Sequence, residues 1–129
     1  MKKATIIVPV YNEEKRASSF LQELIAFCES IPGFFSIIFV NDGSTDNTLN
    51  ILQPFADNNN FVRIISYTPN KGKGFAVKKA VLESTTDYII FIDADGSISP
   101  TVIPEVLQKL ETYDVVVGSR ALETSEAIQ

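Results

Sequence analysis

Two aspartates, Asp93 and Asp95, directly follow an apolar run and are separated by one residue. If the extended geometry of a strand continues through this pair, both carboxylates point to the same side. Paired carboxylates suit Mg²⁺ or Mn²⁺, which also takes oxygens from phosphate groups and neutralises a departing diphosphate. We therefore favour a divalent cation bound by Asp93 and Asp95 over a plain turn at Asp95-Gly96.

A second cluster is basic. The stretch from 71 to 79 carries four lysines and no acidic residue. Gly72 and Gly74 would let backbone amides approach an anion where a helix begins. Lys71 and Lys73 are the better ligand candidates, whereas Lys78 and Lys79 are expected on a solvated helix face. The sequence thus predicts an anion site near 71–74.

Two alternatives stay open on these residues. Gly72-x-Gly74, with Asp93 further along, imitates the fingerprint of a nicotinamide-dinucleotide-binding domain, although Val77 stands where that fingerprint has glycine or alanine. Asp93-x-Asp95 after a strand also suggests a Mg²⁺-dependent phosphatase of the haloacid dehalogenase type. Ser97 fits that pattern only in part.

Three further charged residues are candidates for the same site. Asp42 could accept hydrogen bonds from a ribose hydroxyl or a base N–H, or it could belong to an Asx turn in which Ser44 or Asp46 caps the next helix. Glu13 and Arg120 each follow a predicted strand. The guanidinium fork of Arg120 suits a phosphate, but each of the two is equally consistent with a surface position.

The composition excludes several classes of protein. The chain has no histidine and one cysteine, Cys28, which removes structural zinc sites, disulfide scaffolds and Ser-His-Asp triads. A net charge of −5 argues against nucleic acid as a partner. The 129 residues correspond to a single domain (1–129), and no apolar run approaches the ~20 residues of a membrane helix. We expect a cytoplasmic protein.

The elements that must position these residues alternate between strand and helix. Strands are predicted at Ala4–Val10, Phe34–Val40, Phe61–Tyr67, Asp87–Ile92 and Asp114–Gly118, each followed by polar residues. Helical spacing links Phe20 to Cys28, Leu49 to Phe55, Ala76 to Val81 and Val102 to Leu110. Ser99-Pro100 resembles a helix start that Pro104 delays by a turn.

The order of these elements predicts an α/β fold, with a mostly parallel sheet covered by helices on both faces and the polar residues at one edge. The tail 121–129 shows no pattern that predicts a helix or a strand.

Five motifs follow the predicted strands in order: Val8-Pro9-Val10-Tyr11-Asn12-Glu13-Glu14, Val40-Asn41-Asp42-Gly43-Ser44-Thr45-Asp46, Asn70-Lys71-Gly72-Lys73-Gly74, Asp93-Ala94-Asp95-Gly96 and Gly118-Ser119-Arg120. Together they resemble the family 2 inverting glycosyltransferases of GT-A fold, and most closely the polyprenyl- or dolichyl-phosphate sugar transferases. The resemblance covers essentially the whole chain.

The resemblance implies a nucleotide-sugar site of the Rossmann-like, nucleotide-diphospho-sugar transferase type. Pro9, Tyr11, Glu13 and Asp42 would surround the nucleoside, with the loop of Lys71, Gly72 and Lys73 beside them. The diphosphate and the Mg²⁺ or Mn²⁺ ion would lie at Asp93, Ala94 and Asp95. The implied catalytic residues are Asp93, Asp95 and Arg120, with Arg120 near phosphate.

The implied reaction transfers glucose or mannose from UDP-glucose or GDP-mannose to a lipid-linked phosphate, with inversion. The implied location is the inner membrane surface, as a peripheral protein. Family members continue well beyond Gly-Ser-Arg, so we expect a truncated chain that keeps the donor half, lacks the acceptor half and exposes apolar surface that favours a homo-oligomer.

Overall fold

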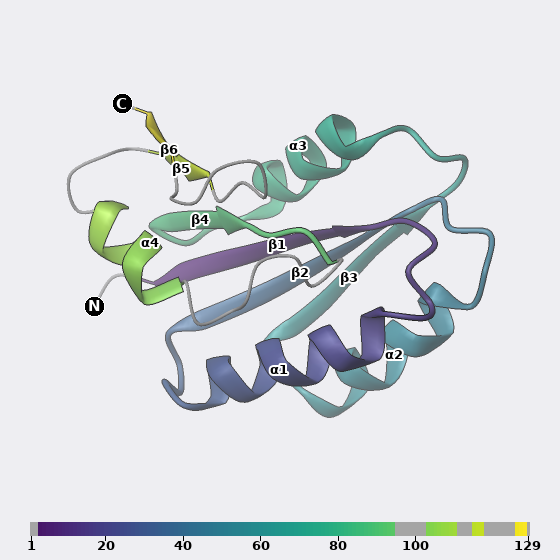
Figure 1. Ribbon diagram of the computed structural model, residues 1–129, viewed down its shortest axis with the longest axis horizontal. Coiled ribbons are helices and arrows are strands. Elements are labelled where there is room, and N and C mark those ends of the chain that lie inside the picture. Colours follow the sequence, from purple (N-terminus) through teal and green to yellow (C-terminus); the bar gives the residue numbers. More distant parts are fainter. Residues whose placement is uncertain (1–2, 95–102, 111–114, 118–125, 129) are drawn as a thin grey trace.

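A computed structural model describes residues 3–94, 103–110, 115–117 and 126–128. Four strands form a parallel sheet in the order β3-β2-β1-β4 (Figure 1). They are β1 (Ala4–Val10), β2 (Phe35–Asp42), β3 (Val62–Tyr67) and β4 (Tyr88–Phe91). The predicted parallel sheet is confirmed, and the carboxyl ends of all four strands therefore meet at one edge.

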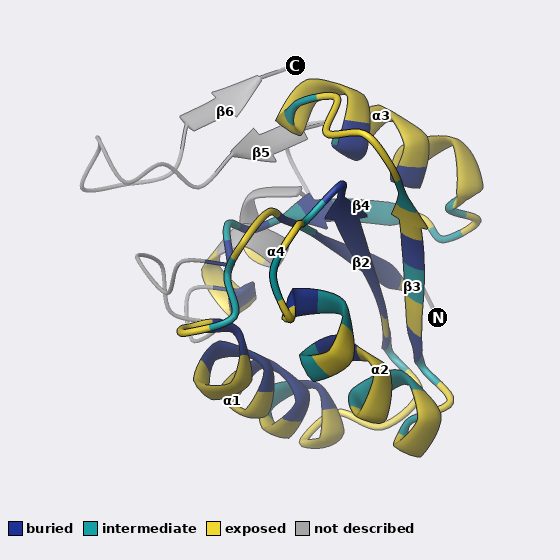
Figure 2. Cartoon of the chain, turned by 90° about the vertical axis from the view of Figure 1, so that its right-hand side faces the viewer, coloured by how far each residue is buried: buried dark blue, intermediate teal, exposed yellow. Residues whose placement is uncertain are grey.

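Helices cover both faces of the sheet, as predicted. On one face lie α1 (Ala17–Glu29) and α2 (Thr48–Asn58), and on the other lies α3 (Lys73–Glu83) (Figure 2). A fourth helix, α4 (Ile103–Leu110), contributes the buried Ile103 to the hydrophobic cluster on the α1 side. Pro104 lies in the first turn of α4, where no intrahelical bond needs its missing N–H. Ser99 and Pro100 lie outside the described residues.

The core consists of two clusters, one on each face. Ile6 and Val8 of β1 pack with α1, whereas Ile7, between them, packs against Ala76 and Ala80 of α3. Both faces of β1 are buried, which explains why its sequence is apolar apart from Thr5 and does not alternate. The predicted apolar stripe of α1 is also confirmed, since every member from Phe20 to Cys28 is buried.

The strand β2 runs further than the sequence predicted. Asn41 and Asp42 were expected in a polar turn, yet they pair with Val10 of β1 and Tyr67 of β3 and belong to the strand. Both side chains are buried. Hydrogen bonds offset that burial for Asp42, whose partners are described below, and in part for Asn41. The Asn41 amide donates to Ser66 Oγ at 3.1 Å, whereas its Oδ1 is buried without a partner among the described residues.

The last part of the chain also differs from the prediction. β5 (Val115–Val117), expected as a fifth parallel strand, pairs antiparallel with β6 (Glu126–Ile128), in the tail for which no element was predicted. The two form a separate sheet within the described residues. None of the helices described is long and apolar enough to cross a bilayer.

Candidate functional site

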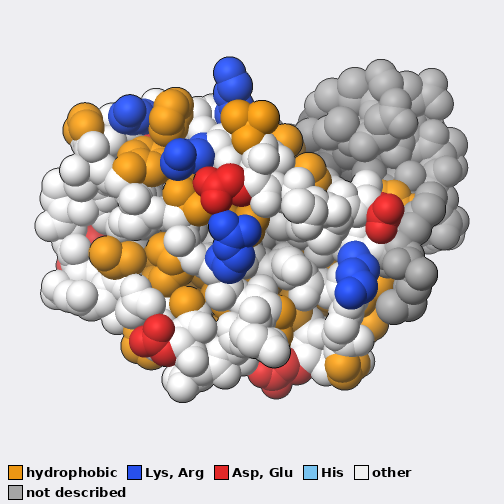
Figure 3. All heavy atoms as spheres, turned by 180° about the vertical axis from the view of Figure 1, so that it is seen from behind, with side chains coloured by type: hydrophobic (Ala, Val, Ile, Leu, Met, Phe, Trp, Pro, Cys, Tyr) orange, Lys and Arg blue, Asp and Glu red, His pale blue; other side chains and the backbone are white. Residues whose placement is uncertain are grey.

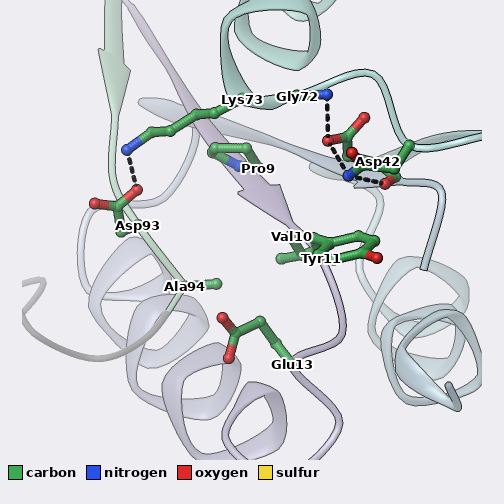
Figure 4. Close-up of a pocket in the computed structure, with 10 residues that line it drawn as sticks. Pro9, Val10, Tyr11, Glu13, Asp42, Gly72, Lys73, Asp93 and Ala94 are labelled. Atoms are coloured by element: carbon green, nitrogen blue, oxygen red, sulfur yellow. Dashed lines mark hydrogen bonds and ion pairs between the residues drawn. The ribbon is translucent and has the colours of Figure 1, made fainter. Parts of the chain in front are cut away.

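A cavity of about 420 Å³ opens at the carboxyl edge of the parallel sheet. It is lined by Pro9, Val10, Tyr11, Glu13, Asp42, Asn70, Gly72, Lys73, Asp93 and Ala94 (Figure 4). Eight of these ten residues are among the candidates predicted from the sequence; Val10 and Asn70 are the two that were missed. The carboxyl ends of β1 and β2 and the segments after β1, β3 and β4 therefore contribute to one site.

Asp93 reaches the cavity because the hydrogen bonding of β4 continues past its last residue. The Ile92 N–H donates to the Ile7 carbonyl at 3.0 Å, and Asp93 and Ala94 come next. The Asp93 carboxylate forms an ion pair with the ammonium group of Lys73, across the cavity from Glu13 (Figure 4). The side chains of Asp93 and Lys73 remain 37% and 55% exposed, so a ligand can reach both.

Asp42 is 3% exposed, and its carboxylate accepts four hydrogen bonds. Oδ1 accepts from the Tyr67 hydroxyl at 2.7 Å and the Lys71 N–H at 2.9 Å. Oδ2 accepts from the Asn70 amide at 2.8 Å and the Gly72 N–H at 3.0 Å. A carboxylate offers about four acceptor positions, so these bonds use its full capacity. Asp42 therefore holds the loop that forms one wall of the cavity.

The same carboxylate changes the acidity of its neighbour. Burial raises the pKa of Tyr67, and the hydrogen bond to Asp42 and the negative charge of Asp42 raise it further. Each of these effects disfavours the phenolate. Tyr67 consequently stays a hydrogen-bond donor over the whole physiological range of pH.

The turn after β2 depends on Gly43. Its φ is +70°, and a Cβ atom built on it would lie 2.3 Å from the backbone nitrogen of Asn70. Only glycine allows the chain after β2 to approach the loop after β3 this closely. The close approach brings Asn70 within reach of Asp42.

The loop after β1 is tied to the loop after β2. Asn12 adopts a left-handed conformation with φ of 51°, which asparagine tolerates better than most residues. Its side-chain oxygen accepts from the Thr45 N–H at 2.8 Å, and its own N–H donates to Ser44 Oγ at 3.0 Å. The next N–H, of Glu13, donates to Thr48 Oγ1 at 2.9 Å. These bonds fix the backbone that presents Tyr11 and Glu13 to the cavity.

Glu13 and Tyr11 differ in how they are held. The Glu13 carboxylate pairs with Arg16 at 2.8 Å and is only 16% exposed, whereas Tyr11 is 46% exposed at the cavity wall. The cavity therefore combines a fixed carboxylate with an accessible aromatic ring.

The cap of α2 settles one alternative left open by the sequence. Asp46, and not Ser44, bonds to the start of the helix, because its Oδ1 accepts from the Thr48 N–H at 2.9 Å, whereas the N-cap residue Asn47 makes no side-chain cap hydrogen bond. Burial alone would raise the pKa of Asp46, but hydrogen bonds from Thr48 and from the Glu14 N–H outweigh it and lower that pKa. Asp42 does not cap the helix, since its carboxylate bonds to the loop after β3.

Of the three remaining predicted residues, Lys71 is described and does not line the cavity. The Lys71 ammonium lies 4.8 Å from the centre of the Phe75 ring, although its backbone N–H binds Asp42. Asp95 and Arg120 lie outside the described residues.

The carboxylate oxygens of the cavity suit a hard cation. Asp93 offers carboxylate oxygens and already pairs with a cationic ammonium group. Among the described residues no group of three or more His, Cys, Asp or Glu side chains could hold a metal ion. Mg²⁺ and Mn²⁺ fit such a site, because they commonly take one or two protein carboxylates and complete their shell with water and phosphate.

The parallel sheet, its order and the cavity at its carboxyl edge define an α/β domain of the GT-A, Rossmann-like type. The chain belongs to glycosyl transferase family 2, whose model matches residues 5–127. This assignment leaves the dinucleotide-binding and phosphatase alternatives without support.

Two relatives make the assignment more specific. A dolichyl-phosphate beta-glucosyltransferase of Trichomonas vaginalis is 38% identical over 95% of this chain, and one of Drosophila melanogaster is 31% identical over 96%. The chain spans 40% and 42% of the length of these relatives.

A solved structure supports the fold. A mannosyltransferase of Pyrobaculum calidifontis, in complex with GDP-Man and Mn²⁺, is 25% identical and superimposes with a TM-score of 0.66 over 73% of this chain and 28% of its own.

Proposed function

We propose that this chain binds a nucleoside-diphosphate hexose and forms the donor-binding part of a hexosyltransferase. One observation carries the proposal: the carboxyl ends of β1 and β2 and the segments after β1, β3 and β4 line a single cavity that contains an aromatic ring, a lysine and carboxylates. The similarity to dolichyl-phosphate beta-glucosyltransferases supports glucose as the sugar, and the GDP-Man complex of the archaeal neighbour supports mannose as the alternative. The acceptor would be a polyprenyl phosphate.

The nucleoside would bind at Pro9, Tyr11, Glu13 and Asp42. The accessible ring of Tyr11 can contact the flat face of a base, and the fixed carboxylate of Glu13 can accept hydrogen bonds from ribose hydroxyls. The four bonds accepted by Asp42 keep the wall formed by Asn70 and Gly72 in place. Binding would then require little rearrangement of the backbone.

The diphosphate would bind at Lys73, Asp93, Ala94 and Asp95. Asp93 and Asp95 would hold Mg²⁺ or Mn²⁺, and the Mn²⁺ in the archaeal complex supports this choice of cation. When bound, the cation would neutralise negative charge on the diphosphate. Lys73 adds a positive charge at the same place, and its ammonium can move from Asp93 to a phosphate oxygen.

The sugar would be transferred with inversion. An oxygen of the acceptor phosphate attacks the anomeric carbon as the bond from that carbon to the diphosphate breaks, and the nucleoside diphosphate leaves with the electron pair. A phosphate monoester has its second pKa near ~6, so it is mostly a dianion at pH 7 and needs little help from a general base. This chemistry suits a chain without histidine. Arg120 would contribute a cation near phosphate.

The location that fits this reaction is the cytoplasmic face of a membrane, where a lipid-linked phosphate presents its head group to a water-soluble donor. The chain would act there as a peripheral protein.

Donor binding is tested by calorimetric titration of UDP-glucose and GDP-mannose in the presence and absence of Mn²⁺. We expect saturable binding of one donor that strengthens with Mn²⁺ and weakens at least tenfold in Asp93→Asn. Asp57→Asn, an exposed aspartate of α2, is the matched control and should bind like the unmodified chain. Binding that ignores both Mn²⁺ and the Asp93 substitution would contradict the roles proposed here.

Transfer is tested separately, with a radiolabelled donor and a short polyprenyl phosphate. A product of inverted anomeric configuration confirms the transferase. Donor binding without product would restrict the function of this chain to donor binding.

A further inference from the structure

The outer face of α3 combines apolar and basic side chains. The helix buries only two small residues, Ala76 and Ala80, against the sheet. Leu82 is 75% exposed, and Phe75, whose ring also packs edge-to-face against Tyr67 at 5.3 Å, is 41% exposed. The exposed Lys78 and Lys79 lie between them in the sequence. Positions 75, 78, 79 and 82 share one face of a helix. We call these four residues, together with Lys71, the α3 stripe.

The α3 stripe is positively charged on an acidic protein. Lys71 packs its ammonium against the Phe75 ring and so extends the stripe beyond the start of the helix. The acidic residue of α3, Glu83, is paired with Arg63 at 2.9 Å, so it does not offset the three lysines. From behind, Figure 3 shows blue and orange side chains close together along the upper edge of the molecule, where α3 lies. A chain with a net charge of −5 thus carries a local cationic surface.

This pattern fits an anionic bilayer better than it fits a second copy of the chain. Helices that lie in the membrane interface place lysines at the level of the head groups and apolar side chains between them. Lysines near an anionic leaflet gain from its surface potential, and the gain decreases as salt screens it. In a symmetric dimer the same stripe would face itself and bring like charges together.

We propose that the α3 stripe is a docking surface for a membrane that contains anionic phospholipids. The docking itself does not depend on the proposed transferase function. The consequence of docking does rest on that function. Lys73, in the first turn of α3, lines the cavity, so docking would hold the cavity beside the bilayer in which a lipid-linked acceptor resides.

The test is co-sedimentation with vesicles of phosphatidylcholine containing 30% phosphatidylglycerol, compared with vesicles of phosphatidylcholine alone. We expect binding to the anionic vesicles only, with most of it lost at 0.5 M NaCl. Lys78→Gln/Lys79→Gln should weaken binding at least tenfold, since each lysine contributes roughly a factor of five. Leu82→Ser should also weaken it, because its side chain is three-quarters exposed and inserts into the interface.

Matched controls separate the α3 stripe from general surface effects. Lys15→Gln removes an exposed lysine from the loop before α1, and Ile31→Ser removes an apolar side chain that is 41% exposed at the opposite end of the sheet from the cavity. Both should bind vesicles like the unmodified chain. Circular dichroism and donor titration in the absence of vesicles should be the same for all variants.

Three outcomes would overturn the proposal. They are no binding to anionic vesicles, equal binding to neutral vesicles, and equal losses in the α3 and control variants. If light scattering instead finds a dimer that Leu82→Ser dissociates, the occupant is a second copy and the membrane proposal is wrong. Failure of donor binding would leave the vesicle result intact, so the two proposals fail independently.

Discussion

The hydroxyl of Tyr67 donates to Oδ1 of Asp42 at 2.7 Å, although 25 positions separate the two residues. The bond joins the last residues of β2 and β3, which are partners in the parallel ladder. The same carboxylate also accepts from the backbone N–H groups of Lys71 and Gly72. A tyrosine at the end of an edge strand therefore helps to shape a site that it does not line.

The ionisation of Tyr67 gives a test of this bond. Burial and the Asp42 carboxylate raise the pKa of Tyr67 well above its ordinary value of about 10. A raised pKa favours the neutral form in the folded state, so this contribution to stability is complete below pH 10 and is lost as the pH rises further. Ultraviolet titration at 295 nm should show one of the four tyrosines ionising late or only upon unfolding.

Tyr67→Phe identifies that group, since the late step should disappear in this variant. Persistence of the step would assign it to another tyrosine and contradict the role of the bond.

Asp42→Asn should loosen the wall of the cavity. An amide in place of the carboxylate presents an N–H₂ group to donors, so at least two of the four hydrogen bonds are lost. We expect the free energy of unfolding to fall by about 2 to 4 kcal/mol. Urea denaturation measures the loss, and donor affinity should fall with it. Asp57→Asn serves as the exposed control; an equal effect in both variants would show that Asp42 has no special role.

Two glycines with positive φ provide a matched pair. A Cβ on Gly43 would lie 2.3 Å from a backbone nitrogen, whereas a Cβ on Gly33 meets nothing within 4 Å. Gly33→Ala should cost about 1 kcal/mol of stability, from the left-handed conformation alone. Gly43→Ala should cost about 3 kcal/mol, because overlap with the 69–70 backbone is added. Similar midpoints of thermal unfolding for the two variants would contradict the close approach of the loops.

The pair of Lys73 and Asp93 should matter for ligand binding and little for stability. Exposed ion pairs contribute at most about 1 kcal/mol, and these side chains are 55% and 37% exposed. Lys73→Met should therefore leave the unfolding midpoint nearly unchanged while weakening donor binding roughly tenfold, as expected for the loss of one charged hydrogen bond. Lys79→Met is the control on the outer side of the same helix. A large loss of stability without loss of binding would make Lys73 a structural residue.

The sequence was sufficient to predict which segments meet at the cavity, but it did not predict the direction of individual side chains. Pro9, Tyr11 and Asp93 could be placed together because the carboxyl ends of parallel strands share an edge. The sequence could not show which of Lys71 and Lys73 faces the cavity, because the direction of each side chain depends on where α3 begins. The helix starts at Lys73, which faces the cavity, and Lys71 remains in the loop over Phe75.

The hydrogen-bond partners of Asp42 could not be predicted from the sequence either. Its bonds to Tyr67, Asn70 and Gly72 join residues 25 to 30 positions apart, and no local pattern encodes them. The sequence offered one signal for their position, a polar pair that directly continues an apolar strand. Because Asn41-Asp42 was interpreted as a turn, the predicted strand ended two residues before β2 does. The antiparallel pairing of β5 with β6 was missed for a related reason: a three-residue strand in a polar tail has too few residues to show a period.

Cys28 should behave as an inert core residue. It packs in the apolar stripe of α1, and burial, with a smaller contribution from the negative charge of Glu29, raises the pKa of its thiol to about 12. Since the thiolate is the nucleophile, the folded protein should react with a disulfide reagent at pH 8 far more slowly than a free thiol. The rate should rise steeply across the unfolding transition in urea. Fast labelling in the absence of urea would mean that α1 opens locally, and the cluster on that face of the sheet would then be less rigid than its burial indicates.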